Sequence, residues 1–144
     1  MQLMKLLRAI VLAAFLAFPA IVHGRVGVSC IDTPVRMCSL VISGKLGPED
    51  LEGIKMVRWK KSGTPDSFTG YVNNKRKDGT VGEEAFYSIY LNSEGGDVAA
   101  ALAIGDILYK ARQTVTVPLW GKCASACVFI LGSAVSRVVL GPVI

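Results

Sequence analysis

Histidine is nearly absent from this sequence: the only one is His23, close to the N-terminus. Residues 24–144 therefore offer no imidazole as a general base or a metal ligand. Acidic residues are missing from the start of the chain, where Asp32 is the first. The main apolar stretch, counted generously from Ala9 to Val22, is shorter than the about 20 residues that a membrane-spanning helix needs. The sequence also has no internal repeat and no low-complexity tract.

The first residues have the composition of a secretory signal. Lys5 and Arg8 precede an uninterrupted apolar run, Ala9–Phe18, and small residues follow up to Gly24. This order predicts a signal peptide over residues 1–24, with cleavage after Gly24. Retention as a membrane anchor and acylation at Cys30 are the weaker alternatives. We therefore expect an exported protein, periplasmic or secreted, without a stable membrane anchor after cleavage.

Charge gives little indication of a polyanionic partner. The formal net charge is +5, and two of the positive charges belong to the predicted signal peptide. The basic clusters Lys60–Lys61 and Lys75–Lys77 lie in a polar stretch rich in glycine, serine and asparagine, which is typical of a solvated loop. We expect no nucleic-acid partner. Residues 25–144 suit one modest domain with its own core.

Four cysteines remain after the predicted cleavage, namely Cys30, Cys38, Cys123 and Cys127. An even number in an exported chain predicts disulfides, and four cysteines allow three connectivities. Local pairing of the first two and of the last two is the simplest, although free buried thiols stay an alternative for the last two. No metal site is expected.

Hydrophobic periodicity alternates between strand and helix along the chain. Pro48 and the acids after it favour a helix start, and Asp97 is a natural N-cap. Residues 60–85 are expected to form a loop or insertion, or an irregular hairpin with a short strand at Phe68–Val72. The alternation predicts an α/β fold with a parallel sheet. The expected strands are Ser39–Ser43, Phe86–Leu91, Thr114–Leu119 and Arg137–Leu140, and the expected helices are Pro48–Trp59, Val98–Arg112 and Ala124–Leu131.

Two turns follow strand ends, where open α/β sheets place their ligands. In Ser93–Gly96 the paired glycines let the backbone approach a substrate closely. In Gly121–Cys127 a serine, Ser125, lies at a strand-to-helix turn, where the helix N-terminus favours an oxyanion. On its residues alone, the glycine turn is more often purely structural, and the serine turn could equally be structural or functional.

The two turns together resemble the ClpP/crotonase superfamily, in particular exported relatives of the Clp protease proteolytic subunit. The segments on which the resemblance rests are Leu91–Asp97 (LNSEGGD) and Gly121–Leu131 (GKCASACVFIL). They are similar to the family's Asn-Ser-Pro-Gly-Gly and Gly-x-Ala-Ala-Ser patterns, in the same order and with a helix between them. The resemblance covers 86–144 well and 39–57 plausibly. It implies repeated β-β-α units with a mainly parallel sheet, incomplete at the C-terminal end.

Carried over by position, Ser125 takes the place of a catalytic nucleophile that acts on a peptide or protein substrate. The resemblance places the oxyanion-hole donors at the amides of Gly95 and Ala126, with Gly96 supporting the turn. Glu94 stands where the family has proline, which puts a carboxylate at the mouth of the site. Family members often form homo-oligomers. The crotonase branch acts on coenzyme A thioesters, which an exported protein rarely meets, so no cofactor is expected.

The general base is missing from this pattern. In the family a histidine follows shortly after the strand that resembles Arg137–Leu140, and this sequence has none there. We expect a truncated or fragmentary chain, weakly active or inactive as it stands. A lysine base, with Lys45, Lys110 and Lys122 as candidates, and a non-catalytic binding or scaffold protein are the alternatives. Whether the chain is an enzyme stays open.

Overall fold

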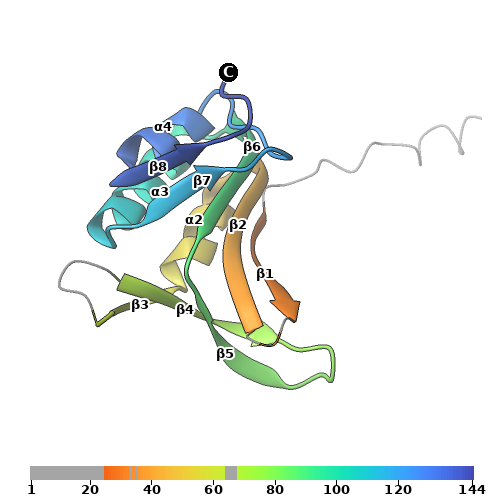
Figure 1. Cartoon of the computed structure of the whole chain (residues 1–144). Helices are drawn as coiled ribbons and strands as arrows, with labels where there is room; N and C mark the ends of the chain where they lie inside the picture. The colour runs from red at the N-terminus through yellow and green to blue at the C-terminus, as the bar shows by residue number, and fades with distance from the viewer. Residues whose placement is uncertain (1–24, 33, 35, 64–67) are drawn as a thin grey trace, which may run out of the picture.

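A computed structural model describes residues 25–32, 34, 36–63 and 68–144. The predicted signal peptide, 1–24, lies outside the described residues. The elements, labelled as in Figure 1, are β1 (Arg25–Asp32), β2 (Arg36–Leu46), α2 (Pro48–Lys55), β3 (Arg58–Lys61), β4 (Phe68–Lys75), β5 (Val81–Phe86), β6 (Ile89–Gly96), α3 (Val98–Lys110), β7 (Thr114–Val117), α4 (Cys127–Ser133) and β8 (Ser136–Val139). The expected mixed α/β class is confirmed.

Five strands form the main sheet in the order β1-β2-β6-β7-β8. Strand β1 runs antiparallel to β2, whereas β2, β6, β7 and β8 run parallel to one another. The carboxyl ends of the parallel strands therefore meet at one edge of the sheet. The end of the chain lies at the same end of the molecule (Figure 1).

The three helices lie on one face of this sheet and enclose the core against it (Figure 1). Alternate residues of each inner strand point into that core, as the period of two requires. Side chains such as Ile42, Leu91 and Val117 are fully buried. Helix α3 adds Ala101, Ile104 and Leu108, which recur at helical spacing. No helix of the described residues is long and apolar enough to cross a membrane.

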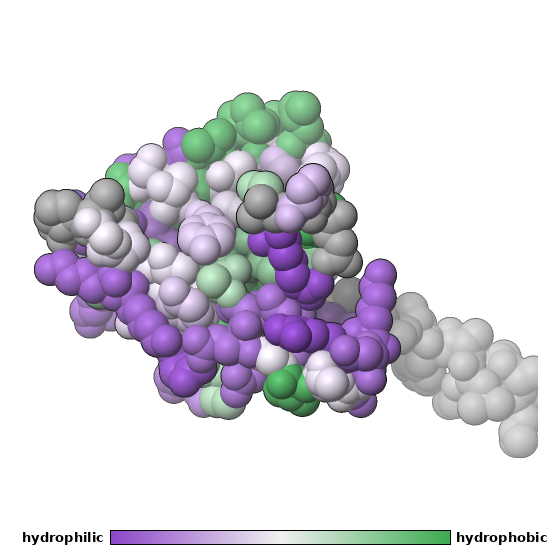
Figure 2. Space-filling model, turned by 60° about the horizontal axis from the view of Figure 1, so that its bottom comes forward, coloured by the Kyte–Doolittle hydropathy of each residue, from purple (hydrophilic) through white to green (hydrophobic). Residues whose placement is uncertain are grey.

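Strands β3, β4 and β5 form a second, antiparallel sheet. Figure 2 shows that hydrophilic side chains gather on the face of the molecule where this sheet lies. Part of its inner side is apolar: the Phe86 ring packs edge-on against Trp59, with 5.6 Å between ring centroids, and lies over Gly70 of β4. The buried carboxylate of Glu84 pairs with Arg36 of β2 at 3.2 Å and Arg76 at 3.1 Å. The stretch expected as a loop or irregular hairpin is thus a three-stranded sheet joined to the main one.

Several element boundaries differ from expectation. The helix expected to fade near Trp59 ends at Lys55, although Val57 is buried just beyond it. The single strand expected over Phe86–Leu91 is divided, because β5 ends at Phe86 and β6 begins at Ile89 in the other sheet. The last helix begins at Cys127 rather than Ala124 and reaches Ser133.

Candidate active site

Ser125 lies in the loop between β7 and α4, two residues before the helix begins. Its side chain is exposed, and its φ of 52° is in the left-handed region. The turn closes locally, because the N–H of Cys127 donates to the carbonyl of Ala124 at 3.1 Å and that of Val128 donates to Ser125 at 3.0 Å. A serine held in this way at a strand-to-helix turn presents its hydroxyl to solvent at the ligand end of the sheet.

Hydrogen bonds to both sides fix the serine turn. On one side it joins the end of β6: the N–H of Ser93 donates to Lys122 at 2.8 Å, and the N–H of Ala124 donates to Ser93 at 3.0 Å. On the other side it joins the end of the chain, where the N–H of Ser125 donates to the carbonyl of Ile144 at 2.9 Å. Cys123 of this turn thus pairs in parallel with Ser93 at the end of β6 on one side and with Val143 on the other.

The glycine turn packs directly against the serine turn. Gly95 and Gly96 have φ values of 94° and 143°, which residues other than glycine rarely adopt. A Cβ atom on Gly95 would lie 2.6 Å from the Cβ of Ser125 and 2.9 Å from the nitrogen of Ala126. The structure therefore brings Gly95 together with Ser125 and Ala126, whereas Gly96, the next residue, lies against the backbone of Leu46.

The two expected amide donors differ in what they bind. The N–H of Gly95 donates to the hydroxyl of Ser93 at 3.1 Å, and that hydroxyl donates in turn to the carbonyl of Gly44 at 2.6 Å. The N–H of Ala126 makes no hydrogen bond to any other residue that the structure describes. Ser93 is fully buried, and its sequence context alone did not predict this role. Its place in the Asn-Ser-Glu-Gly-Gly segment is the signal that marks it.

Both cysteine pairs lie at disulfide distance, in the local connectivity that the sequence favoured. Cys30 and Cys38 face each other across β1 and β2, with 4.1 Å between Cα atoms. Cys123 and Cys127 bracket Ser125, with 5.3 Å between Cα atoms. Glu84 approaches the first pair closely enough to suggest a metal cluster. Because both sulfur atoms are joined and two arginines hold the carboxylate, this cluster lacks the thiolates that a soft metal needs.

The candidate lysines lie at different distances from the serine turn. Lys110 is at the far end of α3, roughly 18 Å along the helix from its start. Lys122 is in the serine turn itself, with its ammonium 4.0 Å from the carboxylate of Glu94. Lys45 pairs in register with Gly95. All three side chains are exposed to solvent.

An open groove borders the glycine turn at the ends of β2 and β6. Its volume is about 440 Å³, and charged side chains of both signs lie along it. It is lined by Lys45, Leu46, Gly47, Pro48, Glu49, Gly96 and Asp97.

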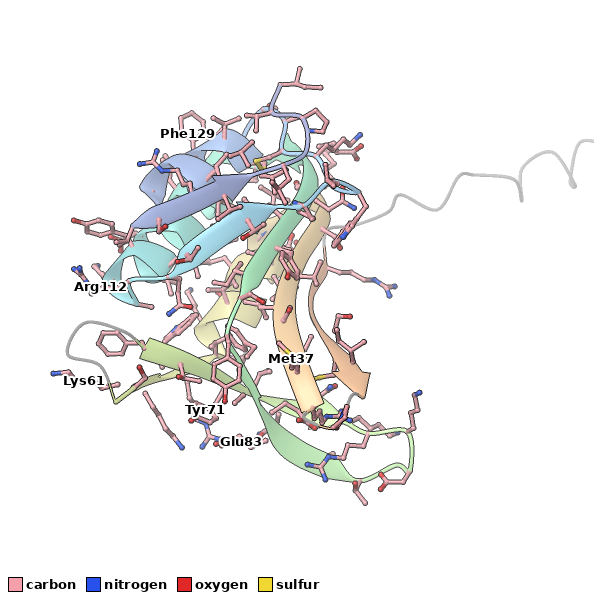
Figure 3. All side chains as sticks on the ribbon, in the orientation of Figure 1. Met37, Lys61, Tyr71, Glu83, Arg112 and Phe129 are labelled. Atoms are coloured by element: carbon pink, nitrogen blue, oxygen red, sulfur yellow. A yellow bond between two sulfur atoms is a disulfide. The ribbon has the colours of Figure 1, made fainter. Side chains whose placement is uncertain are left out.

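The labelled residues of the second sheet, Tyr71 and Glu83, lie at the opposite end of the molecule from Phe129 of α4 (Figure 3). The second, antiparallel sheet is therefore remote from the serine turn, which leads into α4.

The fold and the site define a mixed α/β protein with an exposed serine at a strand-to-helix turn, packed against a glycine pair. Residues 82–141 match the family model described as Clp protease. The match covers less than half of the chain, from β5 to the end of β8, and includes both turns. It supports a ClpP-like family for this part of the chain. No curated protein and no solved structure matches.

Proposed function

We propose that this protein is an exported serine-hydrolase relative of the ClpP type, in which Ser125 occupies the nucleophile position for acyl transfer on a peptide or protein substrate. One observation carries the proposal: the exposed serine has a left-handed backbone and packs against Gly95 at the ligand end of the sheet. The Clp protease match over the same residues supports it. The repeated β-β-α architecture of the superfamily belongs to the same proposal.

In the proposed reaction the Ser125 hydroxyl attacks a substrate carbonyl, and negative charge develops on the carbonyl oxygen. The N–H of Ala126 is the better of the two expected donors for that charge, because no described residue accepts its hydrogen bond. The N–H of Gly95 would have to release Ser93 first. Each such donor contributes about 3–4 kcal/mol to transition-state stabilisation in hydrolases of this kind.

The base limits the proposed activity. A serine hydroxyl is a weak nucleophile until a neighbouring group accepts its proton. The chain has no histidine after His23, and the nearby lysines, Lys45 and Lys122, are exposed. We therefore propose that residues 25–144 are acylated slowly at Ser125 and turn over weakly, and that a base from another segment or subunit would accelerate both steps. A non-catalytic binding protein that keeps the cleft is the alternative.

Export is part of the same proposal. A basic, then apolar, N-terminal segment precedes the described domain, and the four cysteines are paired. Structural disulfides persist mainly in oxidising compartments such as the periplasm. Growth of a strain carrying the full chain, followed by fractionation and mass spectrometry of the N-terminus, tests this point. A protein that starts at Arg25 in the periplasmic fraction is expected, and an unprocessed cytoplasmic chain would contradict it.

A fluorophosphonate probe tests the serine directly. The probe reacts with an activated serine hydroxyl, so we expect label at Ser125 in the full chain and none in Ser125→Ala. Ser136→Ala, which changes an exposed serine in β8, is the matched control and should label normally. If the oxidised, folded chain takes up no label at Ser125, the hydrolase proposal fails and the non-catalytic alternative stands.

A further inference from the structure

The backbone of Ser125 has an uncommon conformation. Among the described residues other than glycine, only Arg112 and Ser125 have a positive φ, of 51° and 52°. Glycine, asparagine and aspartate visit this region routinely, but serine does so at a cost. Arg112 follows the last turn of α3, where a left-handed residue commonly ends a helix. Ser125 precedes a helix, so a different constraint must hold it.

A covalent link spans this residue. Cys123 is fixed in the sheet, because it forms bridges to Ser93 on one side and to Val143 on the other. Cys127 is the first residue of α4, and its side chain is fully buried. The disulfide between them joins a fixed sheet position to a fixed helix start, with Ser125 at the centre of the closed loop. The residues inside that loop have few backbone conformations left.

We infer that the Cys123–Cys127 disulfide is a positioning element of the serine turn: it holds Ser125 in the left-handed conformation that exposes its hydroxyl beside Gly95 and Ala126. The inference rests on the proposed function only for the chemical role of that hydroxyl. The conformational part stands on the bracketed serine alone. The other disulfide, Cys30–Cys38, joins neighbouring strands β1 and β2 and encloses no part of the site, so it provides a matched control.

A stability cycle tests the conformational part without any need for activity. Ser125→Gly removes the cost of the left-handed conformation, which for a residue with a side chain corresponds to about 5-fold or more in the folding equilibrium. We expect this gain in the oxidised chain and in the Cys30→Ala/Cys38→Ala variant. In Cys123→Ala/Cys127→Ala the turn can leave the left-handed region, so Ser125→Gly should bring no gain or a loss. An equal gain in all three backgrounds, measured by urea unfolding, overturns the inference.

A spectroscopic measurement covers the case in which Cys123→Ala/Cys127→Ala does not fold. In the Cys30→Ala/Cys38→Ala variant one disulfide remains, and a thiol reductant opens it in the folded chain. The Cα and Cβ chemical shifts of Ser125 report its φ and ψ. Once a thiol titration shows two free thiols, so that the disulfide is open, we expect these shifts to change from values typical of the left-handed region. Unchanged shifts in the reduced, folded chain would overturn the inference.

Labelling by the fluorophosphonate probe tests the functional part. We expect the labelling rate at Ser125 to fall at least about 10-fold in Cys123→Ala/Cys127→Ala and to change less than 2-fold in Cys30→Ala/Cys38→Ala, because only the Cys123–Cys127 disulfide encloses the serine. Equal rates in the two variants overturn the positioning role. A chain that takes no label in its oxidised form refutes the proposed function, and the stability cycle then still decides the inference.

Discussion

Replacing Gly95 by alanine should damage the site and the fold together. The glycine has a φ of 94°, and a non-glycine residue held in such a region costs about 1–3 kcal/mol. The new methyl group would lie 2.6 Å from the Cβ of Ser125, 2.7 Å from the carbonyl oxygen of Ala124 and 2.9 Å from the nitrogen of Ala126. None of these atoms is the end of a flexible side chain, so relief requires a backbone shift, at about 1–3 kcal/mol for an overpacked position.

The two contributions together predict that Gly95→Ala lowers the free energy of unfolding by roughly 2–6 kcal/mol. Urea unfolding of the oxidised chain measures this loss, and the fluorophosphonate probe measures the accompanying displacement of Ser125. Gly132→Ala is the matched control, because a Cβ atom there meets nothing within 4 Å and the residue lies inside α4. It should stabilise the protein by about 0.5–1 kcal/mol. A Gly95→Ala variant as stable as the parent chain would refute the close approach of the two turns.

Two further predictions concern the starts of the helices that flank the glycine turn. Asp97 caps α3 by accepting a hydrogen bond from the N–H of Ala100 at 2.6 Å, so Asp97→Ala should cost about 1 kcal/mol in thermal or urea unfolding. Asp106→Ala, which removes an exposed pair with Lys110, should cost less than about 0.5 kcal/mol, and equal losses in the two variants would contradict the cap. Asp50 is buried in the first turn of α2, and desolvation raises its pKa above the ordinary 3.8 despite the hydrogen bond from Gly47. Because the folded state then binds this proton more tightly than the unfolded state, the contribution of Asp50 to stability is complete below pH 3.8 and declines as the pH rises through the folded-state pKa. Relative to Asp50→Asn, the parent chain should therefore lose stability as the pH rises from 3.8 through the folded-state pKa, and a difference that does not change with pH would contradict the raised pKa.

The sequence predicted the central part of the fold because local and tertiary preferences agree there. Helix α3 has an apolar stripe, an N-cap and a strand on either side, and its start at Val98 and its cap by Asp97 were both predicted correctly. Strand β1 was missed, although Val26, Val28 and Cys30 alternate with exposed residues. Its period of two lies directly after the predicted signal peptide, and what makes it a strand is its pairing with β2, which one sequence does not reveal.

The errors have a common physical origin in packing between distant segments. Val57 is buried after α2 has ended, so its spacing from Ile54 resembled one more helical turn. The aromatic stretch that begins at Phe86 reads as one strand because apolar and aromatic residues continue across the change from one sheet to the other, although Tyr87 between the two strands is exposed. At the site, the resemblance brought Ser125 and Gly95 together. The segment marks Ser93 as a residue of interest, but the hydrogen bonds of its hydroxyl, from the Gly95 amide and to the Gly44 carbonyl, depend on the fold and could not be predicted.

The second sheet has a consequence for how this domain can be shortened or recombined. Phe86, at the end of β5, is fully buried in the same cluster as Leu40 and Ile89 of the main sheet. The buried Glu84 also pairs with Arg36 at the start of β2, next to the Cys30–Cys38 disulfide. A splice that joined α2 directly to β6 would therefore open the core and remove the buried carboxylate of Glu84, which pairs with Arg36. In protein-engineering terms, the smallest transferable unit of this fold includes the stretch that its composition marks as an insertion.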